Sequence, residues 1–241
     1  MLSSIAHTLR EMLYPSYCLL CRRRIAASEI TDSICASCVG AIKPNIPPFC
    51  PRCGRNAARP DHSGNFCKAC QNARYYFDRA WAGYAYEGTI KEMVHNFKYK
   101  NKINLGKHLC RLLIDFVREY HLPLNGCDCV IPVPLSQAKL REREFNQAQI
   151  LAGAVSDYFG INLLSDALRR ARNTASQTGL DRQKRRQNVK GAFALKNASA
   201  VKEKTILLID DVLTTGATAS EAAKTLKSAG ANSVFVLTVA N

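Results

Sequence analysis

The run Ile206-Leu-Leu-Ile-Asp-Asp-Val-Leu-Thr-Thr-Gly-Ala-Thr218 carries most of the structural information in this 241-residue chain. Its aliphatic residues predict a buried strand that ends at two adjacent carboxylates, Asp210 and Asp211. Successive side chains leave a strand in opposite directions, so the two acids can hold a diol and its metal ion from two sides. The turn that follows opens a helix and offers hydroxyls, backbone N–H groups and a positive helix terminus, which suit a phosphate dianion. The turn residues are Thr214, Thr215, Gly216, Ala217 and Thr218. Acids of this kind beside a phosphate cradle indicate a site for ribose 5-phosphate.

Strand-like and helix-like segments alternate around this run. Strands are expected at residues 80–86, 129–134, 205–210 and 233–239, and helices at 145–159 and 217–228, with two more in 89–120 broken near Asn101. Such alternation predicts an α/β fold with a parallel sheet and helices on both faces. Ligands of such sheets bind at the carboxyl ends of the strands. The sequence contains no P-loop motif and no strand-linked G-x-G-x-x-G, so neither a P-loop NTPase nor a dinucleotide-binding protein is supported.

Eight of the eleven cysteines form four C-x-x-C pairs near the N-terminus. The last four of them repeat the first four at a distance of 32 residues, which indicates a duplicated small module. Two C-x-x-C knuckles together supply the four thiolates of a structural Zn²⁺ site, so two zinc ions are expected. The ligands are Cys18, Cys21, Cys35, Cys38, Cys50, Cys53, Cys67 and Cys70. Sequential pairing follows from the repeat, although the spacing alone also permits a crossed pairing of the knuckles.

Composition and charge limit the class of protein. No apolar run is long enough to span a bilayer, and residues 1–17 predict a short amphipathic helix rather than a signal peptide. With metal-binding rather than disulfide-type cysteines, this favours a cytoplasmic protein. The formal charge of +15 falls to about +11 once two zinc ions bind eight thiolates. A basic surface suits phosphate-bearing partners. We expect a helix and double zinc ribbon at 1–75 and the α/β domain at 76–241.

Residues 169–190 form a second basic feature, with eight basic residues against one acid, Asp181. A long basic segment without an apolar period can close over a polyanion and shield the charge that develops on a leaving pyrophosphate. Arg185 and Arg186 are the candidates for this role.

The chain as a whole resembles the ComF family, in which a double zinc ribbon precedes a type I phosphoribosyltransferase domain. The resemblance rests on the eight cysteines, on the Asp210 to Thr218 run, and on the segments 97–100, 130–134, 143–147, 174–177 and 186–193. One position departs from the family pattern R-G-F-N-Q, because Glu144 stands where the family has glycine.

The resemblance implies a site for phosphoribosyl pyrophosphate (PRPP). Asp210 and Asp211 would bind the ribose hydroxyls, directly and through Mg²⁺, and the threonine turn would hold the 5-phosphate. Pro132, Val133 and Pro134 would face the pyrophosphate, Arg143 would also contact the substrate, and residues 173–190 would be the mobile loop over it.

Two classes of function remain open from the sequence. The first is an enzyme that transfers the phosphoribosyl group from PRPP, for example in nucleotide salvage. The second is a factor in natural transformation, which the ComF resemblance implies, with single-stranded DNA or a competence protein such as a DNA helicase as partner. An aromatic–basic patch at residues 75–76 and 97–100 would suit stacking of bases. Our interpretation combines the two as a competence-type protein with a PRPP-binding domain.

Overall fold

The computed structural model of this chain describes residues 16–25, 33–57, 66–99, 103–172 and 182–241. The helix predicted within residues 1–17 lies almost wholly outside these ranges. Among the described residues, none of the helices is both long and apolar enough to cross a bilayer.

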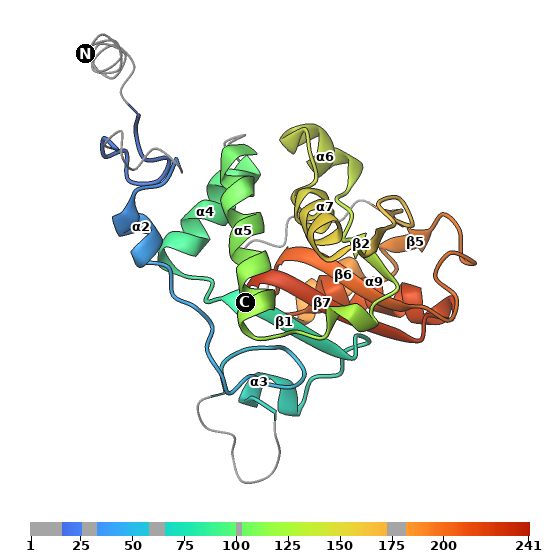
Figure 1. Cartoon of the computed structure of the whole chain (residues 1–241). Helices are drawn as coiled ribbons and strands as arrows, with labels where there is room; N and C mark the ends of the chain where they lie inside the picture. The colour runs from blue at the N-terminus through green and yellow to red at the C-terminus, as the bar shows by residue number, and fades with distance from the viewer. Residues whose placement is uncertain (1–15, 26–32, 58–65, 100–102, 173–181) are drawn as a thin grey trace.

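A five-stranded parallel sheet forms the centre of the molecule (Figure 1). Its order is β1-β7-β6-β2-β3, and every neighbouring pair runs in parallel. The strands are β1 (Arg79–Tyr84), β2 (Cys129–Pro132), β3 (Asn162–Leu163), β6 (Thr205–Val212) and β7 (Ser233–Ala240). The predicted parallel α/β fold is therefore confirmed.

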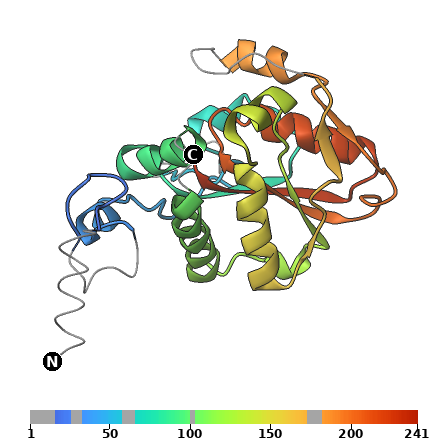
Figure 2. The same ribbon diagram turned by 90° about the horizontal axis from the view of Figure 1, so that it is seen from above.

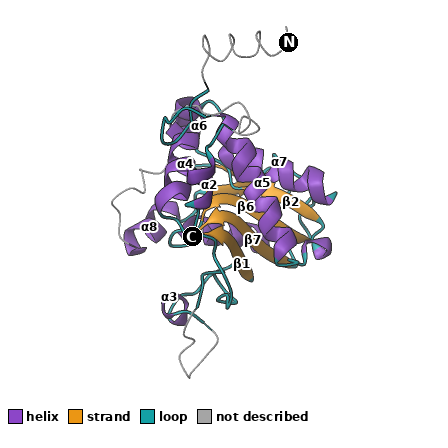
Figure 3. Ribbon diagram, turned by 60° about the vertical axis from the view of Figure 1, so that its left-hand side comes forward, coloured by secondary structure: helices purple, strands orange, loops and turns teal. Residues whose placement is uncertain are grey.

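The side chains of β6 point alternately to the two faces of the sheet, and each face carries one half of the hydrophobic core. Leu207 and Ile209 pack on one face, whereas Ile206 and Leu208 pack on the other. The first face is covered by α4 (Gly88–Tyr99), α5 (Ile103–Glu119) and α7 (Gln147–Phe159). The second face is covered by α9 (Ala217–Ser228) together with the small antiparallel pair β4 (Leu168–Arg170) and β5 (Phe193–Leu195). Figures 2 and 3 show the helices on the two sides of the sheet.

The sequence interpretation missed several short elements. It did not predict α6 (Gln137–Arg143), the 3₁₀ turn η2 (Leu124–Gly126), or strands β3, β4 and β5. Within the basic segment it expected a loop, but residues Arg182–Val189 form helix α8. This expectation was wrong because α8 buries Val189 while its other residues are polar, so its apolar period is too weak to read. Residues 173–181 of that segment lie outside the described ranges.

The two cysteine modules belong to different halves of the core. The first module (residues 18–38, with helix α2, Ala36–Gly40) contributes Cys18 and Cys35 to the half that contains α4 and α5. The second module (residues 50–70, with helix α3, Lys68–Gln71) contributes Cys50, Cys53 and Cys70 to the half that contains α9. The second module is thus part of the sheet's own core, and the expected domain boundary after residue 75 stays a prediction.

The segment before the second module and the first knuckle of that module cover the edge of β1 that faces away from β7. Asn45 N–H donates to the Gly83 carbonyl at 2.9 Å, and Ala80 N–H donates to the Arg52 carbonyl at 2.9 Å. The buried Asn45 amide also donates to the carbonyls of Gly54 and Ala82. An otherwise unpaired edge strand is thereby protected from other chains.

Gly54 permits the closest approach between the second module and β1. Its φ is +71°, and a Cβ at this position would lie 2.6 Å from the Ala80 carbonyl oxygen. Only glycine meets both requirements without displacing the strand.

We expect Gly54→Ala to lower the free energy of unfolding by about 2–4 kcal/mol, because it adds left-handed strain to a backbone clash. Urea unfolding measures the change. Gly153→Ala is the control, since this glycine lies in helix α7 with no atom within 4 Å of the added Cβ, and the substitution should be neutral or stabilising. Equal stability of the two variants would contradict the close docking of the second module.

Candidate functional site

At one position in the sheet, between β2 and β6, the chain leaves the two neighbouring strands toward opposite edges of the sheet. From β2 the chain moves outward to β3, whereas from β6 it moves to β7 on the other side. The carboxyl ends of β2 and β6 therefore diverge, and a crevice opens between them, which is the usual ligand site of such sheets.

A cleft of about 680 Å³ occupies this position. Asp210 and Asp211 enter it from β6, Val133 and Pro134 from the segment after β2, and Thr214 and Thr218 from the turn before α9. The remaining walls are mostly basic or aromatic: Tyr86, Lys91, His95, Lys98, Lys139, Arg143, Arg170 and Arg185. The structure thus brings the acid pair, the threonine turn and the residues after β2 to one cavity.

Asp211 is the better neutralised of the two acids. It is 8% exposed, and its Oδ2 lies 2.7 Å from the Lys98 ammonium of α4. Burial acts to lower the pKa of Lys98, but the Asp211 carboxylate outweighs burial and raises it. Lys98 therefore holds its proton more tightly and acts as a built-in counter-ion of the site.

Burial affects the pKa of Asp210 more than the charges of nearby Lys98 and Arg170 do. Burial, followed by the neighbouring charge of Asp211, raises the pKa of Asp210 to about 7. Its Oδ1 accepts a hydrogen bond from the Asp211 N–H at 2.9 Å, which fixes the side chain in the cleft. A carboxyl group in this state gains from an arriving cation, because the cation stabilises its ionised form.

Several cations line the same cleft close to one another. Burial, and then the charges of Arg143, Arg170 and Lys98, lower the pKa of Lys139. Burial also lowers the pKa of Arg170, against the charge of Asp210. Like charges held this close repel one another, and a polyanion between them would relieve the repulsion.

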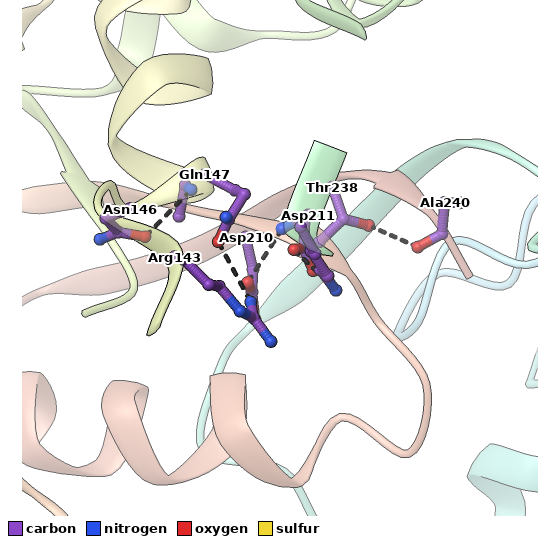
Figure 4. Close-up of polar contacts among 9 residues, drawn as sticks. Arg143, Asn146, Gln147, Asp210, Asp211, Thr238 and Ala240 are labelled. Atoms are coloured by element: carbon purple, nitrogen blue, oxygen red, sulfur yellow. Dashed lines mark hydrogen bonds and ion pairs between the residues drawn. The ribbon is translucent and has the colours of Figure 1, made fainter. Parts of the chain in front are cut away.

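The R-x-F-N-Q segment builds one wall of the cleft (Figure 4). Arg143 is 7% exposed, and its guanidinium donates to the Gln147 Oε1 at 3.2 Å. Asn146 caps α7 through Ala148 N–H and donates to the Val133 carbonyl at 3.1 Å. This motif therefore orients Arg143 and ties the segment after β2 to the start of α7.

Glu144 ends helix α6 with a left-handed backbone, φ +66°. This conformation explains the family's glycine at the position, since glycine adopts it without steric cost. The Glu144 side chain is exposed.

The threonine turn follows β6 directly. Leu213 N–H donates to the Ala240 carbonyl of β7, and Gly216 adopts φ +73° before α9 begins. A small depression is lined by Asp210, by residues 212–218 and by Ala219. Arg185 of α8 donates to the Thr214 hydroxyl at 3.2 Å and also lines the cleft.

Other predicted residues lie elsewhere. Pro132 is buried at the end of β2, one residue before the cleft wall. Arg186 points toward the second module, with its guanidinium 5.9 Å from the Tyr75 ring centroid. In the expected aromatic–basic patch, Phe97 is fully buried, so it belongs to the core and cannot stack on bases. Tyr76 is 51% exposed, with the Lys224 ammonium 5.3 Å from its ring centroid.

Each cysteine module gathers four sulfurs within 4.8 Å of one another. The groups are Cys18, Cys21, Cys35 and Cys38, and Cys50, Cys53, Cys67 and Cys70. Sulfur–sulfur distances of 3.8 and 3.6 Å agree with the edge of about 3.8 Å that Zn–S bonds of about 2.3 Å give a tetrahedron. The two predicted Zn²⁺ sites are confirmed, and the pairing of knuckles is sequential.

Several cleft residues were not identified from the sequence. Lys98 was quoted only as part of a motif, and His95, Lys139 and Arg170 were not singled out. These residues lie near the carboxyl ends of strands or on helices that face those strand ends. Their spacing along the chain does not reveal that they share a cleft.

Comparison with known proteins finds two kinds of domain in the chain. Residues 9–71 match the double zinc ribbon domain, and residues 146–241 match the phosphoribosyl transferase domain. The DNA utilization protein YhgH of Salmonella typhi is 31% identical over 92% of this chain and 95% of its own length. Competence protein F of Haemophilus influenzae is 29% identical over 91% of this chain and 94% of its own length. Competence protein ComFC of Bacillus subtilis is 27% identical over 88% of this chain and 89% of its own length.

We expect Asp210→Asn to stabilise the protein without added Mg²⁺, and to do so more strongly at high pH. The folded-state pKa of Asp210 lies above its unfolded value of about 3.9, so wild type loses stability as the pH rises between about 4 and 7. Asparagine has no such loss, and the melting temperature of the variant should exceed that of wild type by several degrees at pH 8. Thermal unfolding at pH 4.5 to 8 measures this difference.

The control is Asp157→Asn, an exposed acid on α7. A difference between Asp210→Asn and wild type that is the same at every pH would contradict the raised pKa.

Proposed function

Because this chain belongs to the ComF/YhgH family, we propose that it binds PRPP with Mg²⁺ in the cleft between β2 and β6 and handles imported single-stranded DNA in the cytoplasm. The observation that carries the first part is the meeting of the acid pair, the threonine turn and the basic wall at one cavity. Each of these three features matches one part of PRPP.

The match follows the chemistry of the ligand. Asp210 and Asp211 accept hydrogen bonds from the ribose hydroxyls, and the turn from Thr214 to Thr218 binds the 5-phosphate at the start of α9. The basic wall, which includes Lys139, Arg143 and Arg170, then faces the pyrophosphate. A pyrophosphate group there would separate cations that otherwise repel one another.

The acid pair also suits Mg²⁺. This ion binds through one or two carboxylates and keeps several waters when it accompanies a phosphate substrate. When bound, it would neutralise charge on the pyrophosphate. Asp210 is the acid whose pKa burial raises, so we assign it the closer interaction with the metal, while Asp211 keeps its pair with Lys98.

The DNA role is supported by the names of the relatives, which are competence proteins and DNA utilization proteins. The exposed Tyr76 ring lies among basic groups, with Lys224 above it and Arg186 near the Arg74 carbonyl. Aromatic rings in such surroundings bind single strands by base stacking and phosphate contacts. A competence protein such as a DNA helicase is the protein partner that the family relationship suggests.

The combined substitution Asp210→Asn and Asp211→Asn should abolish PRPP binding, since it removes both acceptors of the ribose diol and the metal ligands. Calorimetric titration with PRPP and Mg²⁺ should show binding for wild type and at least a roughly 30-fold loss for the variant. Zinc should remain at two ions per chain.

The matched control is Asp157→Asn with Asp166→Asn, which changes the net charge equally at exposed acids. Equal PRPP affinity of the acid-pair variant and wild type would refute the assignment of the cleft.

For DNA, Tyr76→Ala should weaken binding of a single-stranded oligonucleotide by about 5- to 50-fold, and the affinity of wild type should fall steeply with salt. Fluorescence anisotropy measures both. Tyr158→Ala is the control, because Tyr158 is 53% exposed on α7, at the end of a helix on the opposite face of the sheet from α9. An equal effect of the two substitutions, or no binding at low salt, would contradict this part of the proposal.

A further inference from the structure

The two zinc modules have the same internal structure. Cys18 N–H donates to the Arg23 carbonyl at 2.8 Å, and 32 residues later Cys50 N–H donates to the Arg55 carbonyl at 2.7 Å. The N–H of Cys35 reaches the Cys18 sulfur at 3.4 Å, as that of Cys67 reaches the Cys50 sulfur. Equivalent residues can therefore be compared directly between the modules.

The modules differ where the second one meets the sheet. The left-handed position after the first knuckle is Arg22 in the first module, with an exposed side chain, and Gly54 in the second, where any side chain would strike β1. The first module is thus not docked at this position, whereas the second is.

The next residue shows a second difference. In the first module, the guanidinium of Arg23 donates to Ser37 and lies 3.7 Å from the Cys35 sulfur, within its own module. In the second module, the equivalent Arg55 turns outward and donates to the Thr214 carbonyl at 2.7 Å. The same residue type has exchanged a contact inside the module for a contact to the threonine turn.

Tyr75, which follows the second module, contacts the same turn. Its hydroxyl donates to the Thr215 carbonyl at 3.2 Å, and its ring lies so close to Gly216 that a Cβ there would be 2.7 Å from the Tyr75 Cε1. The ring is stacked on Phe77 with 4.7 Å between centroids, so it has little freedom to move.

These contacts orient the backbone of the turn. In a planar trans peptide the N–H points opposite to the C=O of the preceding residue. With the carbonyls of Thr214 and Thr215 held toward the module, the N–H groups of Thr215 and Gly216 point away from it. The depression that we assign to the 5-phosphate is lined by these same residues, with Thr218 and Asp210.

We propose that the second zinc module is a component of the 5-phosphate site, and that Arg55 and Tyr75 are positioning residues that preset the amides of the turn. The proposal rests on the assignment of the cleft to PRPP. In the described part of the first module, the equivalent Arg23 contacts its own module instead. Zinc in the second module therefore supports ligand binding as well as the local fold, because it fixes the backbone from which Arg55 extends.

The test compares Arg55→Ala with its counterpart Arg23→Ala. Both remove one arginine at the same place in a zinc module. In calorimetric titrations with Mg²⁺, Arg55→Ala should bind ribose 5-phosphate and PRPP about tenfold more weakly than wild type, whereas Arg23→Ala should stay within about twofold. Inorganic pyrophosphate, which binds at the other end of the cleft, should bind all three proteins equally.

The pyrophosphate titration separates positioning from general damage. Zinc content and melting temperature are measured in parallel, and Tyr75→Phe, which removes only the hydroxyl contact to Thr215, should give a smaller loss confined to ribose 5-phosphate and PRPP. Arg55→Lys, which retains a donor, should recover part of the affinity.

Wild-type affinity in Arg55→Ala, an equal loss in Arg23→Ala, or a parallel loss of pyrophosphate binding would overturn the positioning role while leaving the PRPP assignment in place. Failure of wild type itself to bind PRPP and ribose 5-phosphate would remove the proposed function and this inference with it.

Discussion

Two adjacent carboxylates at the carboxyl end of β6 impose the main constraint on this protein. A charge that leaves water must be matched by an opposite charge or give up its ionisation, and both responses occur here. Asp211 is matched by the Lys98 ammonium of α4, 2.7 Å away. Asp210 holds its proton more tightly, with a pKa raised to about 7. The position of α4, the basic wall and the depression before α9 can all be understood as surroundings of this pair.

The same constraint explains why the cleft is basic and why its charges are not balanced without an anionic ligand. Lys139 and Arg170 are partly buried near other cations, and burial lowers the pKa of each. Such an arrangement costs free energy in the absence of a ligand and returns it when an anion binds, as is usual for functional sites. The buried apolar halves of the core on either face of β6 supply the stability that allows this.

The sequence predicted the parts of the structure whose cause is local. The β6 run, the acid pair and the turn are consecutive, and the eight cysteines repeat at a fixed interval, so their grouping in space could be predicted without coordinates. It could not predict contacts between distant segments. Lys98 and Asp211, or Arg55 and Thr214, meet only because the sheet order places β1, β7 and β6 side by side. Helix α8 was missed because it packs against α9 and buries Val189 as its one apolar residue, so it has no periodic apolar face.

The duplicated modules show how metal binding allows the other residues of a small module to vary. Four Zn–S bonds would hold each module together, so few residues between the ligands have to form a core. Replacement of a side chain by Gly54 would weaken an ordinary small domain, yet here it lets one copy approach β1 closely. Once that copy is docked, the arginine in the next position lies within reach of the threonine turn. The other copy has Arg22 and Arg23 at the equivalent positions and keeps its arginine contact inside the module, and this difference between the copies is the basis for assigning one of them to the site.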